Sequence, residues 1–174
     1  MFVYVLRYGS DDPEKSTALK LVRKRLAVRA RLSELSKCCV LLTVFSDRVF
    51  SPEDRELVEK CGIAVVDSSW KSDMELVERV SNSWRGPKRV LPALIAGNPV
   101  NYGVISLLSS AEAIAAALYI SGYVDEAIRV LSQFKWGMTF LELNRELLEL
   151  YRRAPSVREV LEIQNEFLKS RNVI

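Results

Sequence analysis

The chain has 174 residues, of which 49% are hydrophobic and 27% are charged, and its formal net charge is +3. This length and composition suit one compact domain or two small ones with a shared core, and no apolar run is long enough to span a membrane. Histidine is absent, which excludes a Ser-His-Asp triad, a Cys-His pair, a His-ligated zinc and imidazole acid–base catalysis. Any chemistry must therefore use carboxylates, hydroxyls, lysine, backbone amides or a reactive cofactor.

The first half of the chain alternates apolar runs with polar segments. The apolar runs predict five strands, which are Phe2–Leu6, an edge strand at Ala27–Leu32, Cys38–Val44, Ile63–Val66 and Val90–Ala96. The segments between them predict a helix or turn over Ser16–Arg25 and helices from Ser51 to about Lys60 and over Met74–Val80. Strands that alternate with helices favour a mostly parallel sheet. The first residues have neither a basic region nor a cleavage site, so we interpret them as a strand and not as a signal peptide.

The second half of the chain changes character after Ser109. Four helices are expected, over Ser109–Ile120, Val124–Gln133, Thr139–Leu150 and Ser156–Leu168. Three of them begin with the Ser/Thr-x-x-Glu pattern of a capping box. The fold class is therefore α/β, with a mostly parallel-sheet domain over residues 1–92 and an all-helical domain over residues 93–174.

A strongly basic segment lies near the N-terminus. Residues 15–31 contain seven lysines and arginines and no acidic residue, whereas the rest of the chain is net negative. A local basic patch on a near-neutral body is typical of a nucleic-acid-binding protein, and a solvated helix face is the alternative. The candidate binding residues are Lys20, Arg23, Lys24, Arg25, Arg29 and Arg31.

The three cysteines, Cys38, Cys39 and Cys61, do not have the spacing of metal ligands. We expect them to be buried, reduced thiols in a cytoplasmic protein.

A strand, a loop and a capped helix follow one another over residues 90–120. The loop Gly97–Gly103 lacks the glycine spacing of a P-loop or a Rossmann fingerprint, but it would present backbone amides where α/β proteins bind small molecules. A structured turn is the alternative. Glu112 is expected to cap the helix, and Asn98 and Asn101 are expected to hold the shape of the loop.

Three other places contain residues suited to binding. Asp67 ends a predicted buried strand and could bind a ribose or an ammonium group or act as a base, while Trp70 could stack on a base; a cap and a core residue are the alternatives. The loop Trp84–Arg89 is basic and has an exposed-looking aromatic residue, so RNA contact and a solvated loop both remain open. Phe134 and Trp136 are expected to pack between two helices.

Several segments of the chain together resemble a known family. They are Asp12–Thr17, Val65–Trp70, Leu91–Gly103, Leu108-Ser109 with Glu112-Ala113, and Phe134–Gly137 with Phe140-Leu141 and Leu143-Asn144. In this order they resemble the ribosome-biogenesis aminocarboxypropyltransferases of small-subunit ribosomal RNA, and the resemblance covers nearly the whole chain. It implies a fold like that of the SPOUT RNA methyltransferases, with a deep trefoil knot that sequence patterns alone would not suggest.

The resemblance implies a specific reaction. The 3-amino-3-carboxypropyl group of S-adenosylmethionine (SAM) would be transferred to N3 of N1-methylpseudouridine in small-subunit rRNA, with methylthioadenosine as the product and no need for a metal. The partner would be rRNA or a pre-ribosomal particle, and the protein is expected to be a cytoplasmic monomer without membrane contact. A SPOUT-type RNA methyltransferase and a non-catalytic RNA-binding assembly protein are the alternatives.

The resemblance also implies the residues of the site. The expected cofactor contacts are Thr17, Val66, Asp67, Trp70, Leu91, Ser106, Leu108 and Ser110. Asp67 is the expected catalytic residue, either as acceptor of the uridine proton or as the group that orients the transferred ammonium. The helix that opens at Ser110 would meet the methionine carboxylate with its positive end.

The chain departs from the usual family pattern in two ways. Ser16 and Ser68 stand where the family commonly has cysteine, which argues against a thiol nucleophile. Val104-Ile105-Ser106 replaces an Arg-Pro-aromatic stretch, so contacts here would have to come from the backbone.

Overall fold

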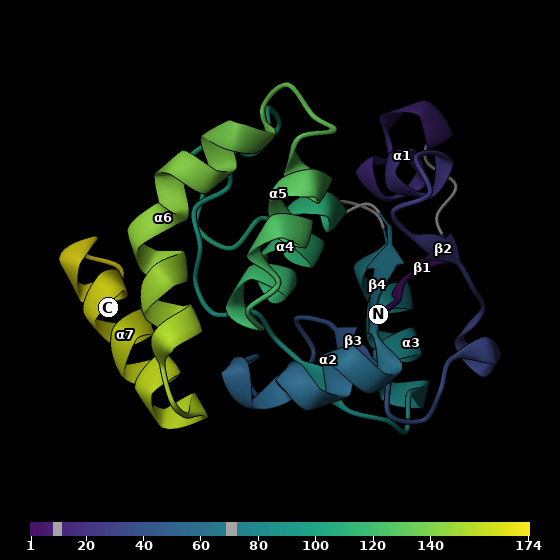
Figure 1. Ribbon diagram of the computed structural model, residues 1–174, viewed down its shortest axis with the longest axis horizontal. Helices are drawn as coiled ribbons and strands as arrows, with labels where there is room; N and C mark the ends of the chain where they lie inside the picture. The colour runs from purple at the N-terminus through teal and green to yellow at the C-terminus, as the bar shows by residue number, and fades with distance from the viewer. Residues whose placement is uncertain (9–11, 69–72) are drawn as a thin grey trace. The chain divides into compact units, whose positions relative to one another are not determined.

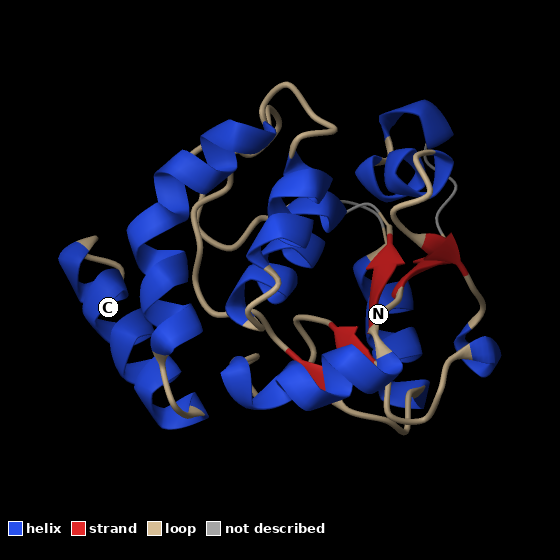
Figure 2. Cartoon of the chain, in the orientation of Figure 1, coloured by secondary structure: helices blue, strands red, loops and turns tan. Residues whose placement is uncertain are grey.

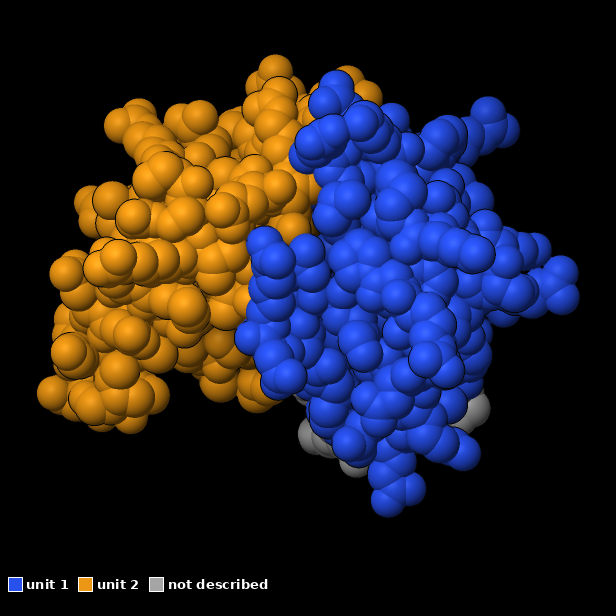
Figure 3. Space-filling view, turned by 90° about the horizontal axis from the view of Figure 1, so that it is seen from below, with its two compact units in different colours: residues 1–48, 56–90 blue, residues 49–55, 91–174 orange. Residues whose placement is uncertain are grey.

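The computed structural model describes residues 1–8, 12–68 and 73–174 (Figure 1). The chain divides into two compact units (Figure 3). The sheet unit contains residues 1–48 and 56–90, and the helical unit contains residues 49–55 and 91–174. Within the described ranges, no helix is both long and apolar enough to cross a membrane.

A parallel sheet of five strands forms the centre of the sheet unit (Figure 2). Its strands are β1 (Val3–Arg7), β2 (Val28–Arg29), β3 (Val40–Leu42), β4 (Ile63–Asp67) and β5 (Lys88–Arg89). They lie in the order β2-β1-β4-β3-β5, and every pair is parallel. The longest pairing, between β1 and β4, runs from Val3 opposite Ile63 to Arg7 opposite Asp67. The carboxyl ends of the two central strands therefore meet at Arg7 and Asp67.

Short helices connect the strands of the sheet unit. They are α1 (Thr17–Arg23), α2 (Arg55–Cys61, whose first residue belongs to the helical unit) and α3 (Met74–Ser83), with 3-10 turns at Pro13–Lys15, Leu32–Glu34 and Pro52–Asp54. One face of the sheet packs against α3 in a hydrophobic cluster made by Leu6, Leu35, Cys39, Leu41, Ala64, Val80 and Trp84. Ser51 caps the turn before α2 through its side chain, with Pro52 at the first position.

The helical unit is built around one buried helix. Its elements are α4 (Ser110–Ile120), α5 (Val124–Leu131), α6 (Gly137–Arg153) and α7 (Val157–Ser170). Nine of the 11 residues of α4 are buried, as in a helix that is covered on all sides. Helices α5 and α6 pack against α4, and α7 packs against α6.

The α/β class, the parallel sheet and the number of helices described in the second half agree with the sequence analysis. Two predicted capping boxes are wrong, because α6 already begins at Gly137, before Thr139, and Ser156 makes no side-chain cap bond at the start of α7. The strand predicted at Val90–Ala96, however, does not form. The sheet ends with β5 at Lys88–Arg89, and Ile95 makes only an isolated bridge with Ile105. Pro92 has no backbone N–H, and side chains from α6 and α7 bind this segment in place of a neighbouring strand.

The expected SPOUT-like fold with a deep trefoil knot must also be corrected. The described residues form an α/β structure with a five-stranded parallel sheet and seven α-helices, and no knot is shown in them. The expectation came from the resemblance alone, since no pattern in the sequence requires the chain to be threaded through itself, and unknotted connections are the rule.

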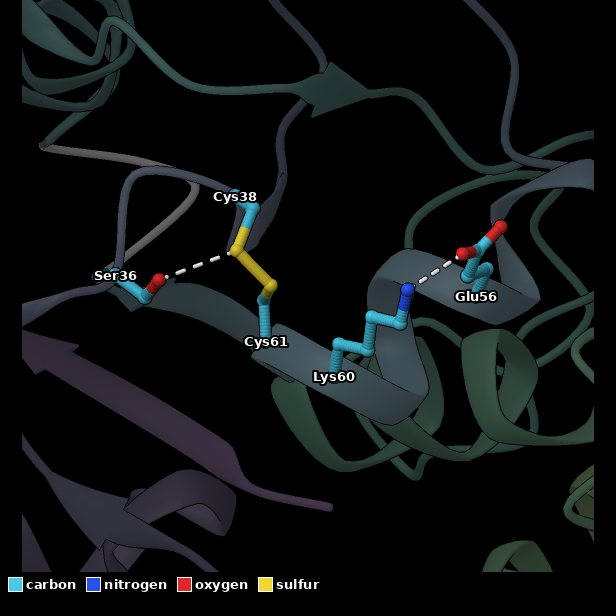
Figure 4. The surroundings of a disulfide bond; sticks show 5 residues. All are labelled: Ser36, Cys38, Glu56, Lys60 and Cys61. Atoms are coloured by element: carbon cyan, nitrogen blue, oxygen red, sulfur yellow. Dashed lines mark hydrogen bonds and ion pairs between the residues drawn. A yellow bond between two sulfur atoms is a disulfide. The ribbon is translucent and has the colours of Figure 1, made fainter.

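The prediction of three reduced cysteines is wrong for two of them. Cys38 and Cys61 form a disulfide, with 5.6 Å between their Cα atoms (Figure 4). Val40 pairs with Ile63 in the β3–β4 register, so the residues two positions before each lie side by side at the amino ends of these strands. Cys39 points to the other face and is free and buried. Burial raises the pKa of its thiol to about 12.

Candidate functional site

A buried ion pair lies where β1 and β4 end. Arg7 Nη1 is 2.7 Å from Asp67 Oδ2, and the two side chains are only 7% and 8% exposed. Ser16 Oγ donates a second hydrogen bond to the same oxygen at 2.8 Å. These two contacts fix the orientation of the Asp67 carboxylate. They also supply the ion-pair partner and the hydrogen bond that a buried charge needs.

Ser16 connects this carboxylate to the start of α1. Its hydroxyl oxygen accepts the backbone N–H of Leu19 at 3.0 Å, which makes it the N-cap of the helix. Thr17 is therefore held at the first helical position, close to Asp67. The carboxyl ends of parallel strands are where α/β proteins bind ligands.

The structure places one more of the predicted residues of the sheet unit, Val66. The side chain of Val66 packs against the hydrophobic cluster that includes Leu6 and Ala64, so Val66 can offer only its backbone at the strand end. Trp70 lies outside the described residues.

In the helical unit, the loop after residue 96 is organised by one buried carboxylate. Glu112 is completely buried, and its Oε1 accepts the backbone N–H groups of Gly97 at 2.7 Å and Asn98 at 2.9 Å. Its Oε2 accepts the Asn98 side-chain amide and the Ser109 N–H, each at 2.7 Å. Ser109 Oγ accepts the Glu112 N–H in return, at 3.2 Å. The predicted capping box is confirmed, and its carboxylate also fixes the loop.

Asn98 holds the remainder of the loop. Its Oδ1 accepts the backbone N–H of Asn101 at 3.0 Å, and its Nδ2 donates to the Leu107 carbonyl at 3.3 Å. Asn98 thus shapes the loop as predicted, whereas Asn101 takes part through its backbone.

Three polar side chains bind the extended segment before the loop. Asn144 on α6 accepts the Ile95 N–H and donates to the Ile95 carbonyl, both at 2.7 Å. Tyr151 donates to the Ala93 carbonyl at 2.9 Å, and Gln164 on α7 accepts the Ala93 N–H at 2.8 Å. The sequence analysis did not identify these three residues. Their signal was a polar group among apolar positions of an amphipathic helix, which is most visible at Asn144.

The predicted cofactor residues of the helical unit all lie on or beside this segment. Leu91 begins it, Leu108 is buried before α4, and Ser110 is the first residue of α4. Ser106 donates its N–H to the Leu94 carbonyl at 2.8 Å and has a left-handed backbone with φ 65°. The segment therefore reaches the N-terminus of an 11-residue helix, where backbone N–H groups favour an anion.

The basic residues predicted to bind nucleic acid gather on one stretch of the sheet unit. Lys20 and Arg23 lie on α1, Lys24 and Arg25 follow its end, and Arg29 lies on β2. Arg31 pairs with Glu34 at 3.3 Å and remains highly exposed.

Two expectations about aromatic residues have opposite outcomes. Trp84 is buried and donates its indole N–H to the Pro87 carbonyl at 3.3 Å, so the basic loop does not expose an aromatic ring. Phe134 is buried as predicted, with its ring centroid 4.9 Å from that of Trp136.

Comparison with known proteins gives a consistent result. Residues 40–168 match a family model described as ribosome biogenesis protein, C-terminal. A relative from Sulfurisphaera tokodaii, named 16S rRNA aminocarboxypropyltransferase, is 43% identical over 97% of this chain and 96% of its own length. A relative of the same name from Methanothermobacter thermautotrophicus is 46% identical over 97% of this chain and 99% of its own length.

A solved structure is similar over almost the whole chain. It is described as the SAM-dependent rRNA:acp-transferase Tsr3 from Vulcanisaeta distributa, with a TM-score of 0.86 and 36% identity, and the match covers 96% of this chain and 88% of that one. The likeness extends to the α/β arrangement described above and lends no support to a SPOUT-like knot.

The family model and the similar solved structure define the class as ribosome biogenesis proteins. Within that class the chain belongs to the 16S rRNA aminocarboxypropyltransferase family. The family that the sequence motifs suggested is thereby confirmed.

Proposed function

We propose that this chain transfers the 3-amino-3-carboxypropyl group of SAM to N3 of a modified uridine, N1-methylpseudouridine, in small-subunit rRNA. The observation that carries this proposal is the end-to-end similarity to relatives named for the reaction, at 43% and 46% identity. The solved neighbour described as SAM-dependent supports the choice of cofactor.

The residues of each unit suit a part of SAM. In the sheet unit, the Asp67 carboxylate suits the ammonium group, and Thr17 begins α1 directly after Ser16, which binds this carboxylate. In the helical unit, Leu91 and Leu108 offer backbone groups for adenine, while the N-terminus of α4 at Ser110 suits the methionine carboxylate. Together with Val66, Ser106 and Trp70, these are the cofactor residues that we propose.

Bound SAM supplies a carbon that is already activated by the sulfonium, so methylthioadenosine leaves without help from a metal. The protein's task is positioning. Asp67 Oδ2 is held by Arg7 and Ser16, so the carboxylate has a fixed orientation in which to receive the ammonium of the transferred group. We therefore assign Asp67 as the residue that orients this group.

Six cations on and around α1 and β2 are proposed to bind phosphates of the rRNA, namely Lys20, Arg23, Lys24, Arg25, Arg29 and Arg31. Such contacts release counterions, so the affinity should fall steeply with salt. We propose that the protein works as a cytoplasmic monomer on rRNA or a pre-ribosomal particle. Size-exclusion chromatography tests the monomer, and cell fractionation tests the location.

A transfer assay with two labelled cofactors tests the reaction. SAM labelled on its methyl carbon and SAM labelled on its carboxypropyl carbons are incubated separately with the protein and a 16S rRNA transcript that contains N1-methylpseudouridine. We expect only the carboxypropyl label in RNA. Methyl label alone would identify an RNA methyltransferase. RNA binding without SAM binding in calorimetry would identify a non-catalytic assembly protein.

A further inference from the structure

Arg25 ends α1 with a left-handed backbone, at φ 60°. Leu26 donates its N–H to the Leu21 carbonyl at 2.9 Å, and Arg25 donates to the Val22 carbonyl at 3.0 Å. These two bonds define a Schellman motif, in which the left-handed position is usually glycine and sometimes asparagine. Other residues are strained there because Cβ approaches a carbonyl oxygen.

The same motif ends two other helices of the chain with the usual residues. After α4 it is made by Gly122 at φ 94°, with the Tyr123 N–H bonded to the Leu118 carbonyl at 2.8 Å. After α7 it is made by Asn172 at φ 56°, with the Val173 N–H bonded to Leu168 at 3.0 Å. The turn itself therefore gives no reason for an arginine at position 25.

The surroundings of Arg25 do not give a structural reason either. A cation near a helix C-terminus is favourable, but the last turn of α1 already contains Lys20 and Arg23, and Lys24 follows directly. A further positive charge adds repulsion. The Arg25 side chain is exposed, and it has no ion pair or hydrogen bond within the described residues. What the arginine offers is an exposed guanidinium on a side chain that leaves the backbone in a direction fixed by the turn.

We propose that Arg25 is an anchoring residue that binds a phosphate of the RNA substrate, and that its strained backbone is retained for this contact. The proposal rests on RNA being the substrate of the proposed function. The two hydrogen bonds of the turn fix the direction in which the side chain leaves the helix. The seven residues of α1 span roughly 10 Å, and the helix begins at the Ser16–Asp67 contact. A phosphate held by Arg25 therefore lies about one short helix away from the reacting end of the sheet unit.

The test compares stability with RNA affinity in the full chain. Arg25→Gly removes both the strain and the charge, Arg25→Lys keeps both, and Asn172→Gly is the matched control at the equivalent turn of α7. The probe is an unmodified 16S rRNA transcript, with binding measured over a range of salt concentrations and unfolding followed by thermal melting.

We expect Arg25→Gly to melt roughly 2–4 °C higher and to bind RNA several-fold more weakly. Its plot of log affinity against log salt should be shallower by about 0.7 to 0.9, the value for one lost phosphate contact. Arg25→Lys should retain the wild-type slope and melting temperature. Asn172→Gly should retain the wild-type RNA affinity.

Two results overturn the proposal. If Arg25→Gly binds RNA with the wild-type affinity and salt slope, Arg25 does not contact a phosphate. If Arg25→Gly does not melt higher than the wild type, the position is not strained. Failure of the wild-type protein to bind the transcript or to transfer the carboxypropyl label is a separate result, and it counts against the proposed function.

Discussion

At the scale of single residues, Asp67 combines a structural role with a proposed binding role. The Asp67→Asn variant loses the buried ion pair between Arg7 and Asp67, which should lower the free energy of unfolding by about 3 kcal/mol. The amide also cannot hold an ammonium as the carboxylate does, so we expect SAM affinity in calorimetry to fall by about tenfold or more.

A double variant separates the two effects. Arg7→Met combined with Asp67→Leu removes both charges, so it should recover most of the lost stability while SAM binding stays weak. If either variant binds SAM with the wild-type affinity, Asp67 does not contact the cofactor.

Glu112 offers a second test at this scale, because its two oxygens accept four N–H donors. In Glu112→Gln, the new amide group must face at least one of these donors, and the charge that strengthens the bonds is lost. We expect the free energy of unfolding in urea to fall by about 3 kcal/mol. The control is Glu142→Gln, since Glu142 is exposed on α6. Equal stability of the two variants would contradict the importance of this carboxylate for the loop.

At the scale of elements, the disulfide connects the start of β3 to the end of α2, just before β4. Its two cysteines are 23 residues apart in the sequence, and closing a loop of this size stabilises a fold by about 3 kcal/mol. Reduction should lower the melting temperature of the wild-type protein. The Cys38→Ala/Cys61→Ala variant should melt at about the temperature of the reduced wild-type protein, whether or not reductant is present.

Cys39 should not disturb that experiment. Its thiol is buried and its pKa is raised to about 12, so it is not a nucleophile for disulfide exchange near neutral pH. A wild-type melting temperature that does not change on reduction would show that the bond contributes no stability.

The contact between α4 and α6 predicts that the stability of the protein depends on pH in the acid range. Tyr119 donates to Glu149 Oε1 at 2.5 Å, and Arg152 lies 2.7 Å from Glu149 Oε2. The hydrogen bonds from Arg152 and Tyr119 lower the pKa of Glu149 to about 2. A lowered pKa in the folded state gives stability that is complete above the unfolded pKa, near 4.5, and is lost as the pH falls toward 2.

Denaturant unfolding between pH 5 and pH 2 checks this prediction. The wild-type protein should lose stability across this range more steeply than Glu149→Gln, which has no carboxylate to protonate at this position. Since Glu149 is about one-third exposed, the difference should be modest. Parallel curves for the two proteins would contradict the contribution of this contact.

At the scale of the whole molecule, the basic segment should govern the response of RNA binding to salt. Replacing Arg23, Lys24 and Arg25 together by glutamine removes up to three phosphate contacts, so the salt slope should fall by roughly 2 to 3. A matched triple replacement of Arg158, Lys169 and Arg171 on and after α7 should not change the slope. Equal slopes for both variants would show that the basic segment is a solvated face.

The features that the sequence predicted depend on residues close together in the chain. Ser109 and Glu112 are three residues apart, and the capping box could be identified from that spacing alone. Apolar runs located β1, β3 and β4 for the same reason. The functional assignment came from motifs spread over the chain that together resemble one family.

The features that were missed depend on residues far apart in the chain. Arg7 is 60 positions from Asp67, and the pairing of Cys38 with Cys61 requires the register of β3 against β4. The run at Val90–Ala96 has the composition of a strand, but its hydrogen-bond partners are side chains 49 to 71 positions later. The knot had been inferred from the resemblance and not from the residues.

The late position of Gln164 has a consequence for how the protein is made. The chain emerges from a ribosome at roughly 5–20 residues per second. The Ala93 N–H therefore has no hydrogen bond to Gln164 until a further 71 residues have been synthesised. Asn144 and Tyr151 are also synthesised long after the segment that they bind. The sheet unit can form during translation, whereas residues 91–96 reach their final place only when the last helix is complete. The packing of residues 91–96 is therefore completed only after Gln164 has been synthesised.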